Sequence, residues 1–499
     1  MDMNFWLPPL IIASSFITGL LIFFVAEHNV RLRTTLNLFG AFLKLGLVAW
    51  LIWGVFNAQE FEARWELAPG LELLLRADAL SVLFVGLSAF LWFVTTVYAI
   101  GYLESHKNRS RFFGFFSFCV TATVGLALAG NLFTFVVFYE LLTLATYPLV
   151  AHKGTKEALK GARTYLMYTL GGGLMLLFGV IFLQTTAGPI EFTQGGVLGE
   201  RQDLDAGQLR WAFFFIIAGL GVKAALFPLH GWLPKAMVAP APVSALLHAV
   251  AVVKAGAFGI VRVVYDVYGV EFADELGVLV WLGALASFTI IYGSVKALSQ
   301  DHLKKRLAYS TISQVSYIAL GAAIVGPVAT IGGLVHLVHQ GIMKITLFFA
   351  AGIYDEALGI HKVSEMNGVG RLMPGTTLAF TIAALGMIGV PPVAGFVSKW
   401  YLGLGAMQVG LGHWVLPILL ISSALNAAYL LPILYRAWFT PPDSTLIPAK
   451  HTGRAETRLT LLLPPIITAA LALLFGLLAA APFSPLEWVQ LIAEREYRL

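Results

Sequence analysis

The feature that most constrains the fold of this chain is a series of apolar runs that recurs from the N-terminus to nearly the last residue. Each run is about 20 residues long, the length of helix that crosses the hydrocarbon core of a bilayer. Because 58% of the 499 residues are hydrophobic and only 12% are charged, most of the chain cannot form a water-exposed surface. The sequence therefore predicts an all-α, polytopic membrane protein with no soluble catalytic domain.

The apolar runs, and the charged, Gly or Pro residues that bound them, predict about 14 transmembrane helices. The first run has no basic residue before it and no small-residue cleavage site after it, so we expect a span and not a signal peptide. The predicted spans are 5–26, 34–56, 79–100, 112–129, 131–150, 161–183, 210–230, 243–265, 276–297, 308–326, 328–352, 376–401, 410–436 and 459–481.

The charges of the connecting loops alternate along the chain, as expected when Lys and Arg collect on the cytoplasmic side of a membrane. Every second loop is acidic or nearly uncharged. This alternation supports the predicted spans and predicts that both termini lie on the non-cytoplasmic side. The basic loops contain Arg31/Arg33, Lys107/Arg109/Arg111, Lys153/Lys156/Lys160/Arg163, Lys235, Lys304/Lys305/Arg306, Lys362/Arg371 and Arg436/Lys450/Arg454.

The spans divide into N-terminal helices (1–111), two blocks of five helices (112–265 and 276–436) and a C-terminal loop, last span and tail (437–499). Because the two blocks begin on opposite sides of the membrane, any structural relation between them must be inverted, as in many transporters. The fourth helix of each block is interrupted, at Pro228 in the first and at Pro391 and Pro392 in the second. Such a break frees backbone carbonyls and is tolerated where protein or water binds them again.

Five ionisable side chains lie deep inside predicted spans, where a charge costs at least about 2.5–3.5 kcal/mol. They are Glu140, Lys223, Lys254, Lys344 and Lys399. One interpretation is a static ion pair between Glu140 and Lys223 that fixes two helices. Four lysines with one acid fit a static network poorly, because unpaired buried cations are destabilising. A buried lysine whose carboxylate partner moves can gain and lose a proton, so the set favours a proton relay.

The span 328–352 carries His336, His339 and Lys344 on one half of its surface, which predicts a polar stripe facing the interior of the bundle. Histidine titrates near neutral pH and passes protons through either ring nitrogen, so the stripe suits a proton path between the two blocks. His248 is a further proton-transfer candidate, although a lone buried histidine is more often a hydrogen-bonded structural residue. No carboxylate or thiolate shares the face of His336, so a metal site is not predicted.

The sequence contains no motif for redox, nucleotide-binding or hydrolytic chemistry. The single cysteine, Cys119, excludes disulfides and thiolate metal clusters, and there is no phosphate loop, nucleotide fingerprint or catalytic triad spacing. The net charge of +5 arises from basic residues in short loops, which orientation in the membrane explains without a nucleic-acid partner. We therefore expect no cofactor, no metal and no self-contained active site.

Several segments resemble the signature of the proton-conducting antiporter-like subunits, which respiratory complex I, membrane-bound hydrogenases and the multisubunit Mrp cation/proton antiporters share. The resemblance implies the fold of that family, which has 14 helices with two inverted five-helix repeats. The segments are Phe227–Pro234, Ala239–His248, Val253–Gly256, Asp301–Ser313 and Gly389–Lys399.

The same resemblance implies roles for four residues. Glu140 corresponds to the essential glutamate of the first half-channel and Lys223 to its lysine partner. Lys254 corresponds to the central lysine, and Lys399 to the terminal residue of the second half-channel. A lysine at position 399 and a length near 500 favour the D-type subunit of Mrp antiporters, whereas the stretch 237–254 is more similar to their A-type subunit and to complex I.

The sequence thus predicts a proton-translocating subunit of a sodium/proton antiporter in a prokaryotic inner membrane. Its expected partners are other membrane subunits of a hetero-oligomeric complex, lipid, protons, and sodium or potassium. Few oxygen ligands accompany the buried lysines, so the cation is expected to pass elsewhere in the complex. The alternatives are a proton-pumping subunit of a complex I-like or hydrogenase-like, redox-driven complex, and a purely structural scaffold whose buried charges are dispensable.

Overall fold

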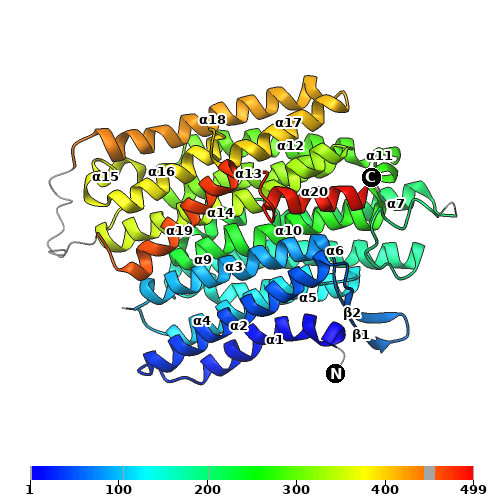
Figure 1. Ribbon diagram of the computed structural model, residues 1–499, viewed down its shortest axis with the longest axis horizontal. Helices are drawn as coiled ribbons and strands as arrows, with labels where there is room; N and C mark the ends of the chain where they lie inside the picture. The colour runs from blue at the N-terminus through cyan, green and yellow to red at the C-terminus, as the bar shows by residue number, and fades with distance from the viewer. Residues whose placement is uncertain (1–2, 105, 202, 443–455, 498–499) are drawn as a thin grey trace.

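The computed structural model describes residues 3–104, 106–201, 203–442 and 456–497 as a bundle of long helices running between two ends (Figure 1). Lys450 and Arg454 of the last basic loop lie outside these residues. Within the described part, 11 helical segments are long and apolar enough to cross a membrane, which confirms the all-α, polytopic fold. They are α1 (Met3–Phe23), α2 (Val30–Phe56), α3 (Ala79–Tyr102), α4 (Arg109–Ala127), α5 (Leu132–Val150), α6 (Lys156–Ala187), the composite segment Ala241–Tyr268, α12 (Val278–Leu298), α14 (Pro327–Leu358), α18 (Gly412–Phe439) and α19 (Leu459–Leu477).

Three predicted spans are not among these 11, so the count of 14 stays a prediction. Span 210–230 is divided into α7 (Ala206–Lys223), an irregular segment around Pro228, and α8 (Trp232–Lys235). Span 308–326 is α13 (Leu303–Ala323), a helix rich in Ser, Thr and Gln. Span 376–401 is divided into α16 (Pro374–Ile388) and α17 (Ala394–Gln408), on either side of the proline pair. Both helix breaks therefore occur where the sequence predicts them.

The segment Ala241–Tyr268 is a single span with irregular winding. It comprises α9 (Ala241–Ala245), a π-helical turn η2 (Leu246–Val250), α10 (Val252–Arg262) and a second π-helical turn η3 (Val263–Tyr268). Its membrane-spanning window and that of α14 are completely buried within the chain, so these two helices form the centre of the bundle. Short helices connect the spans: η1 (Ala236–Val238), α11 (Val270–Glu275), η4 (Val363–Glu365) and α15 (Val369–Leu372).

One end of the bundle carries an antiparallel hairpin of β1 (Phe61–Ala68) and β2 (Leu71–Ala77), with Phe61 paired to Ala77. We call this end the hairpin face. The helix α1 begins there, and the last helix, α20 (Pro485–Glu496), ends there (Figure 1). The hairpin and α20 were not among the predicted elements. Which side of a membrane the hairpin face occupies stays a prediction.

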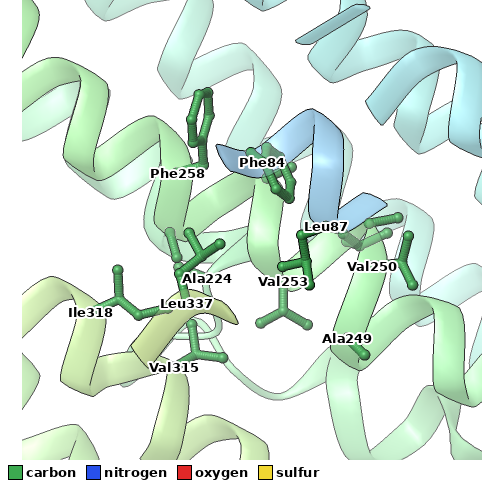
Figure 2. Close-up of a cluster of buried hydrophobic side chains, with 14 of the residues drawn as sticks. Phe84, Leu87, Ala224, Ala249, Val250, Val253, Phe258, Val315, Ile318 and Leu337 are labelled. Atoms are coloured by element: carbon green, nitrogen blue, oxygen red, sulfur yellow. The ribbon is translucent and has the colours of Figure 1, made fainter. Parts of the chain in front are cut away.

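A cluster of apolar side chains fills the space between the centre of the bundle and its neighbouring helices. Figure 2 shows Phe84 and Leu87 of α3 facing Val253 and Phe258 of α10, with Leu337 of α14 close by. Completely water-excluded packing of this kind gives a low local dielectric, in which any polar group must find a partner inside the protein. The buried lysine amines near this cluster therefore need hydrogen-bond acceptors within the protein.

Candidate functional site

The structure buries all four lysines that the sequence singled out. Lys223, Lys254 and Lys344 are 0% exposed, and Lys399 is 9% exposed. Among the described residues, none of them lies within ion-pair distance of a carboxylate; each amine instead donates to a carbonyl or a hydroxyl. The static ion pair between Glu140 and Lys223 is therefore not seen in this structure.

Glu140 and Lys223 nevertheless lie close together, on α5 and at the end of α7. The Lys223 amine donates to the backbone carbonyl of Tyr139 and lies 3.4 Å from the centre of the Tyr139 ring. Such a cation–π contact stabilises an amine that has left water. The Tyr139 hydroxyl in turn donates to the Gly219 carbonyl of α7 at 2.9 Å. The lysine is thus held beside the residue that precedes Glu140, and not by Glu140 itself.

The Glu140 carboxylate is packed on Gly173 of α6. Its Oε1 atom has no hydrogen-bond partner among the described residues, and Glu140 is only partly buried. A Cβ atom on Gly173 would lie 1.8 Å from Oε1, so only glycine leaves room for the carboxylate there. This gives a specific role to Gly173 within the glycine run 171–173.

Lys254 links the two central helices, because its amine donates to the Leu337 carbonyl of α14 at 2.7 Å. The preceding π-helical turn shifts the register of the span just before this residue. Two residues later, a Cβ atom on Gly256 would lie 2.2 Å from the Ala224 backbone nitrogen. Glycine at this position therefore allows α10 to approach the broken end of α7, directly beside Lys223.

Lys399 binds the broken end of α16. Its amine donates to the carbonyls of Met387 and Ile388 at 3.1 and 2.8 Å, and to Ser423 Oγ at 3.0 Å. The last carbonyls of a helix lack intrahelical donors and carry the negative end of the helix dipole. The proline break thus creates the acceptors that hold a buried amine in place of a carboxylate.

A continuous series of polar groups joins Lys344 to Lys399. Lys344 donates to Ser310 Oγ at 2.7 Å, and the Tyr429 hydroxyl lies 2.8 Å from the same oxygen. Tyr429 also contacts Asn426 Oδ1 at 2.7 Å, and Asn426 Nδ2 donates to the Met387 carbonyl at 3.2 Å. That carbonyl is one of the two that accept from Lys399. The structure therefore brings two predicted residues together through three side chains from α13 and α18.

The histidines divide into two groups. His336 Nδ1 lies 2.8 Å from Ser398 Oγ, next to Lys399, while its Nε2 and both nitrogens of His339 are buried without a partner among the described residues. His248 is stacked on Phe348 with ring centres 4.4 Å apart, and its Nε2 lies 3.3 Å from Met237 Sδ. His336 thus contacts the polar series, whereas the surroundings of His248 are mainly apolar.

Sequence reasoning missed several buried polar groups. Tyr429 and Ser310 complete the series above. Lys44 of α2 is 0% exposed and donates to Ser15 Oγ at 2.5 Å; a charge within an apolar run was the signal that could have identified it. Arg262 and Asp266 are also buried, although Asp266 was assigned to a loop; their i, i+4 spacing could have indicated an internal pair.

Comparison with known proteins identifies the family. The model of the NADH:quinone oxidoreductase/Mrp antiporter transmembrane family matches residues 129–425. The chain belongs to this family. A second model, for the N-terminus of chain 5 of NADH-ubiquinone oxidoreductase (complex I), matches residues 69–113. It follows that the chain is an antiporter-like subunit of the kind found in Mrp and complex I-like membrane complexes.

Individual relatives of the family come from both kinds of complex. The chain is 35% identical over 425 residues to an NADH-quinone oxidoreductase subunit N from Desulforudis audaxviator, with 83% of each chain covered. It is 32% identical over 416 residues to a putative antiporter subunit, mnhA2, of Staphylococcus aureus, but spans only 51% of that longer chain. Its fold matches a chain in the Mrp complex of Dietzia sp. with a TM-score of 0.87 at 22% identity, covering 99% and 98% of the two chains.

Proposed function

We propose that this protein conducts protons through the partly buried Glu140 and the buried groups Lys223, Lys254, His336, His339, Lys344 and Lys399, with His248 at the margin of the path. In this proposal residues 112–265 and 276–436 are inverted repeats that each contribute half of the path. The observation that carries it is the polar series from Lys344 through Ser310, Tyr429 and Asn426 to the carbonyl bound by Lys399.

Two physical features support transfer over a purely structural role. Amine, hydroxyl and imidazole groups can each give up one proton and accept another, so Lys344, Ser310 and Tyr429 can pass a proton along. The Asn426 amide and the Met387 carbonyl are not carriers of this kind; they fix the polar path that a water would complete to Lys399. In addition, buried polar atoms without a protein partner are sites where ordered water binds. Buried side-chain atoms of His336, His339 and Gln340 have no hydrogen-bond partner among the described residues, and they lie along α14 from the residue before Leu337, whose carbonyl binds Lys254, towards Lys344. Water at these atoms would connect the two halves.

We further propose that proton flow through this protein is coupled to outward transport of a monovalent cation, sodium in the first instance, in an Mrp-type complex. The buried amines of Lys223, Lys254, Lys344 and Lys399 repel a metal cation when they are protonated, and few carboxylates among the described residues lie near them to bind one. The cation therefore passes through another part of the complex. Lys399 at the broken helix supports this assignment through its resemblance to the D-type subunit of Mrp antiporters.

A second candidate is proton pumping in a redox-driven, complex I-like assembly. The specific observation in its favour is the match to an NADH-quinone oxidoreductase subunit N, which covers 83% of both chains, whereas the putative antiporter relative is covered over about half of its length. The two candidates share the proton path and differ in what drives it.

The decisive experiment measures proton movement in everted vesicles that contain the whole complex. Lys223→Ala and Glu140→Ala are each expected to abolish transport while the complex still assembles. Lys305→Ala and Glu157→Ala remove the same charges from exposed positions and should transport like the wild type. Transport that starts on addition of sodium or potassium supports the antiporter, and transport that requires an electron donor and quinone supports the second candidate. Unchanged transport in both buried-site variants would show that these charges are structural.

A further inference from the structure

A compact cluster of charged groups at the hairpin face lies outside the proposed proton path. Arg262 at the end of α10 donates to both oxygens of Asp78, at 2.7 and 2.8 Å, and to Asp266 Oδ2 at 2.8 Å. Its Nη2 also donates to Ser81 Oγ at 2.6 Å. Arg262 and Asp266 are each 1% exposed. One guanidinium therefore already compensates two carboxylates inside the protein.

A third carboxyl group, that of Glu496, joins this cluster from the end of α20. Its Oε2 accepts from the Gly195 backbone nitrogen at 3.1 Å, and Thr193 of the same loop donates its backbone N–H to the Asp266 carbonyl at 3.1 Å, so the two carboxyl groups come close enough to interact. Two ionised carboxylates at such close range repel each other, whereas a protonated carboxyl can donate to an ionised one. With three carboxyl groups and one guanidinium, a fully ionised cluster would also carry a net charge of about −2 away from bulk water.

The titration of the groups outside the spans agrees with this geometry. Burial would raise the pKa of Asp78, but the charge and hydrogen bonds of Arg262 hold it below its ordinary value, so Asp78 stays ionised. Burial and the nearby Asp266 raise the pKa of Glu496 from 4.5 to about 9. The groups that face Glu496 from the packed elements are Asp78 of α3, Arg262 of α10, Asp266 of η3, Glu271 of α11, and its own neighbour Tyr497.

The end of α20 is fixed at the same place by a second set of contacts. The Tyr497 hydroxyl accepts from the Gly326 backbone nitrogen at 2.9 Å and lies 3.0 Å from Thr330 Oγ1 of α14. Tyr265 of η3 contacts the same threonine at 3.0 Å. Beside these residues lies a cavity of about 300 Å³ lined by Glu200, Glu271, Glu275 and Glu496. Glu496 therefore lines this cavity, whereas Asp266 is 1% exposed and is not part of its lining.

We propose that Asp266 and Glu496 share one proton, and that this proton latches the end of α20 onto the hairpin face. When this proton is lost, both adjacent carboxyl groups are ionised, and their repulsion releases the end of α20. The latch lies apart from the proposed proton path, so this proposal does not depend on the proposed function.

The sign of the pH dependence follows from the raised pKa. In the released state Glu496 is solvated with its ordinary pKa of 4.5, whereas in the latched state its pKa is about 9. Between these values the latched state binds more protons than the released state. Release therefore becomes easier as the pH rises, by up to about tenfold per pH unit, and the effect levels off above the latched pKa.

Hydrogen exchange of the purified complex in lipid nanodiscs tests the latch. Protection factors for the amides of 485–497, corrected for intrinsic exchange, are compared at about pH 6.5 and about pH 8.5. We expect a loss of at least about tenfold at the higher pH in the wild type. Glu496→Gln, whose amide can donate to Asp266 permanently, should keep the same protection at both pH values. Glu494→Gln removes an exposed carboxylate from the same helix and should behave like the wild type.

Should Glu496→Gln fail to assemble, Asp266→Asn tests the same contact from the other side. It removes the charge of Asp266 but not the burial of Glu496, so it should weaken the pH dependence. Wild-type protection that is equal at the two pH values overturns the proposal. So does a pH dependence in Glu496→Gln or Asp266→Asn that matches the wild type.

Discussion

At the scale of single residues, one oxygen atom lies in the middle of the polar series that joins Lys344 to Lys399. The Tyr429 hydroxyl contacts both Ser310 and Asn426, so Tyr429→Phe removes that atom and little volume. We expect proton transport in vesicles to slow by about tenfold, which corresponds to about 1.4 kcal/mol in the barrier. Tyr354→Phe is the matched control: Tyr354 is equally buried and its hydroxyl donates to Thr377 at 3.0 Å, off the path.

Tyr429→Phe loses two hydrogen-bond contacts and Tyr354→Phe loses one, so at about 1 kcal/mol each the expected losses of stability are about 2 and about 1 kcal/mol. Thermal unfolding of the two complexes measures both losses. A slowing of transport that is the same in both variants would trace the effect to stability, and the role of Tyr429 in the series would be wrong.

A second prediction at this scale concerns the position of the Glu140 carboxylate. Gly173→Ala places a methyl group 1.8 Å from Oε1, so the flexible end of Glu140 must move while the backbone can stay. We expect transport to fall severalfold with an unchanged melting temperature. In Gly171→Ala the added methyl group meets nothing within 4 Å, so no side chain is displaced and transport should be normal. The helix itself should not be weakened, because alanine is a better helix former than glycine by about 1 kcal/mol. Equal transport in the two variants would mean that the place of the carboxylate is unimportant.

At the scale of helices, the packing of α10 on the broken end of α7 depends on Gly256. A methyl group there would lie 2.2 Å from the Ala224 nitrogen and 2.7 Å from the Leu220 carbonyl oxygen, and neither backbone atom can move freely. We expect Gly256→Ala to destabilise the protein by about 1–3 kcal/mol, the usual cost of overpacking. Gly46→Ala, with nothing within 4 Å, is the control. Thermal unfolding in detergent measures both, and an unaffected Gly256→Ala would contradict the observed helix contact.

The helices also show how far the sequence could predict the fold. Apolar length and loop charge are strong signals, so most spans agree with the structure to within a few residues, and proline identified both breaks. The π-helical turns in Ala241–Tyr268 left no such signal, because a π turn is decided by packing and not by one residue type. The hairpin 61–77 lay in a short charged stretch that was interpreted only as a loop, and α20 is too polar on average to appear as a span.

At the scale of the whole molecule, the site was predictable only where a charge stood inside an apolar run. Glu140 and the four lysines met that criterion, and the structure buries every one of the lysines. The contacts between them were not predictable, since Ser310 and Tyr429 are ordinary residues within helices that are distant in sequence. The carbonyls that bind Lys399 come from the backbone and have no sequence signature at all.

The arrangement of the two blocks leads to a final prediction, which concerns whether they act in series. In a single path the delays of successive steps add, so Gly173→Ala in the first block and Tyr429→Phe in the second should each slow transport on their own. Their combination should then be slower than the slower single variant by no more than about twofold. Two independent channels would behave differently: each single variant would keep about half of the wild-type rate, and only the double variant would fall severely. Initial rates of proton movement in vesicles with equal amounts of complex distinguish the two cases, and the second result would separate the blocks into parallel conductors.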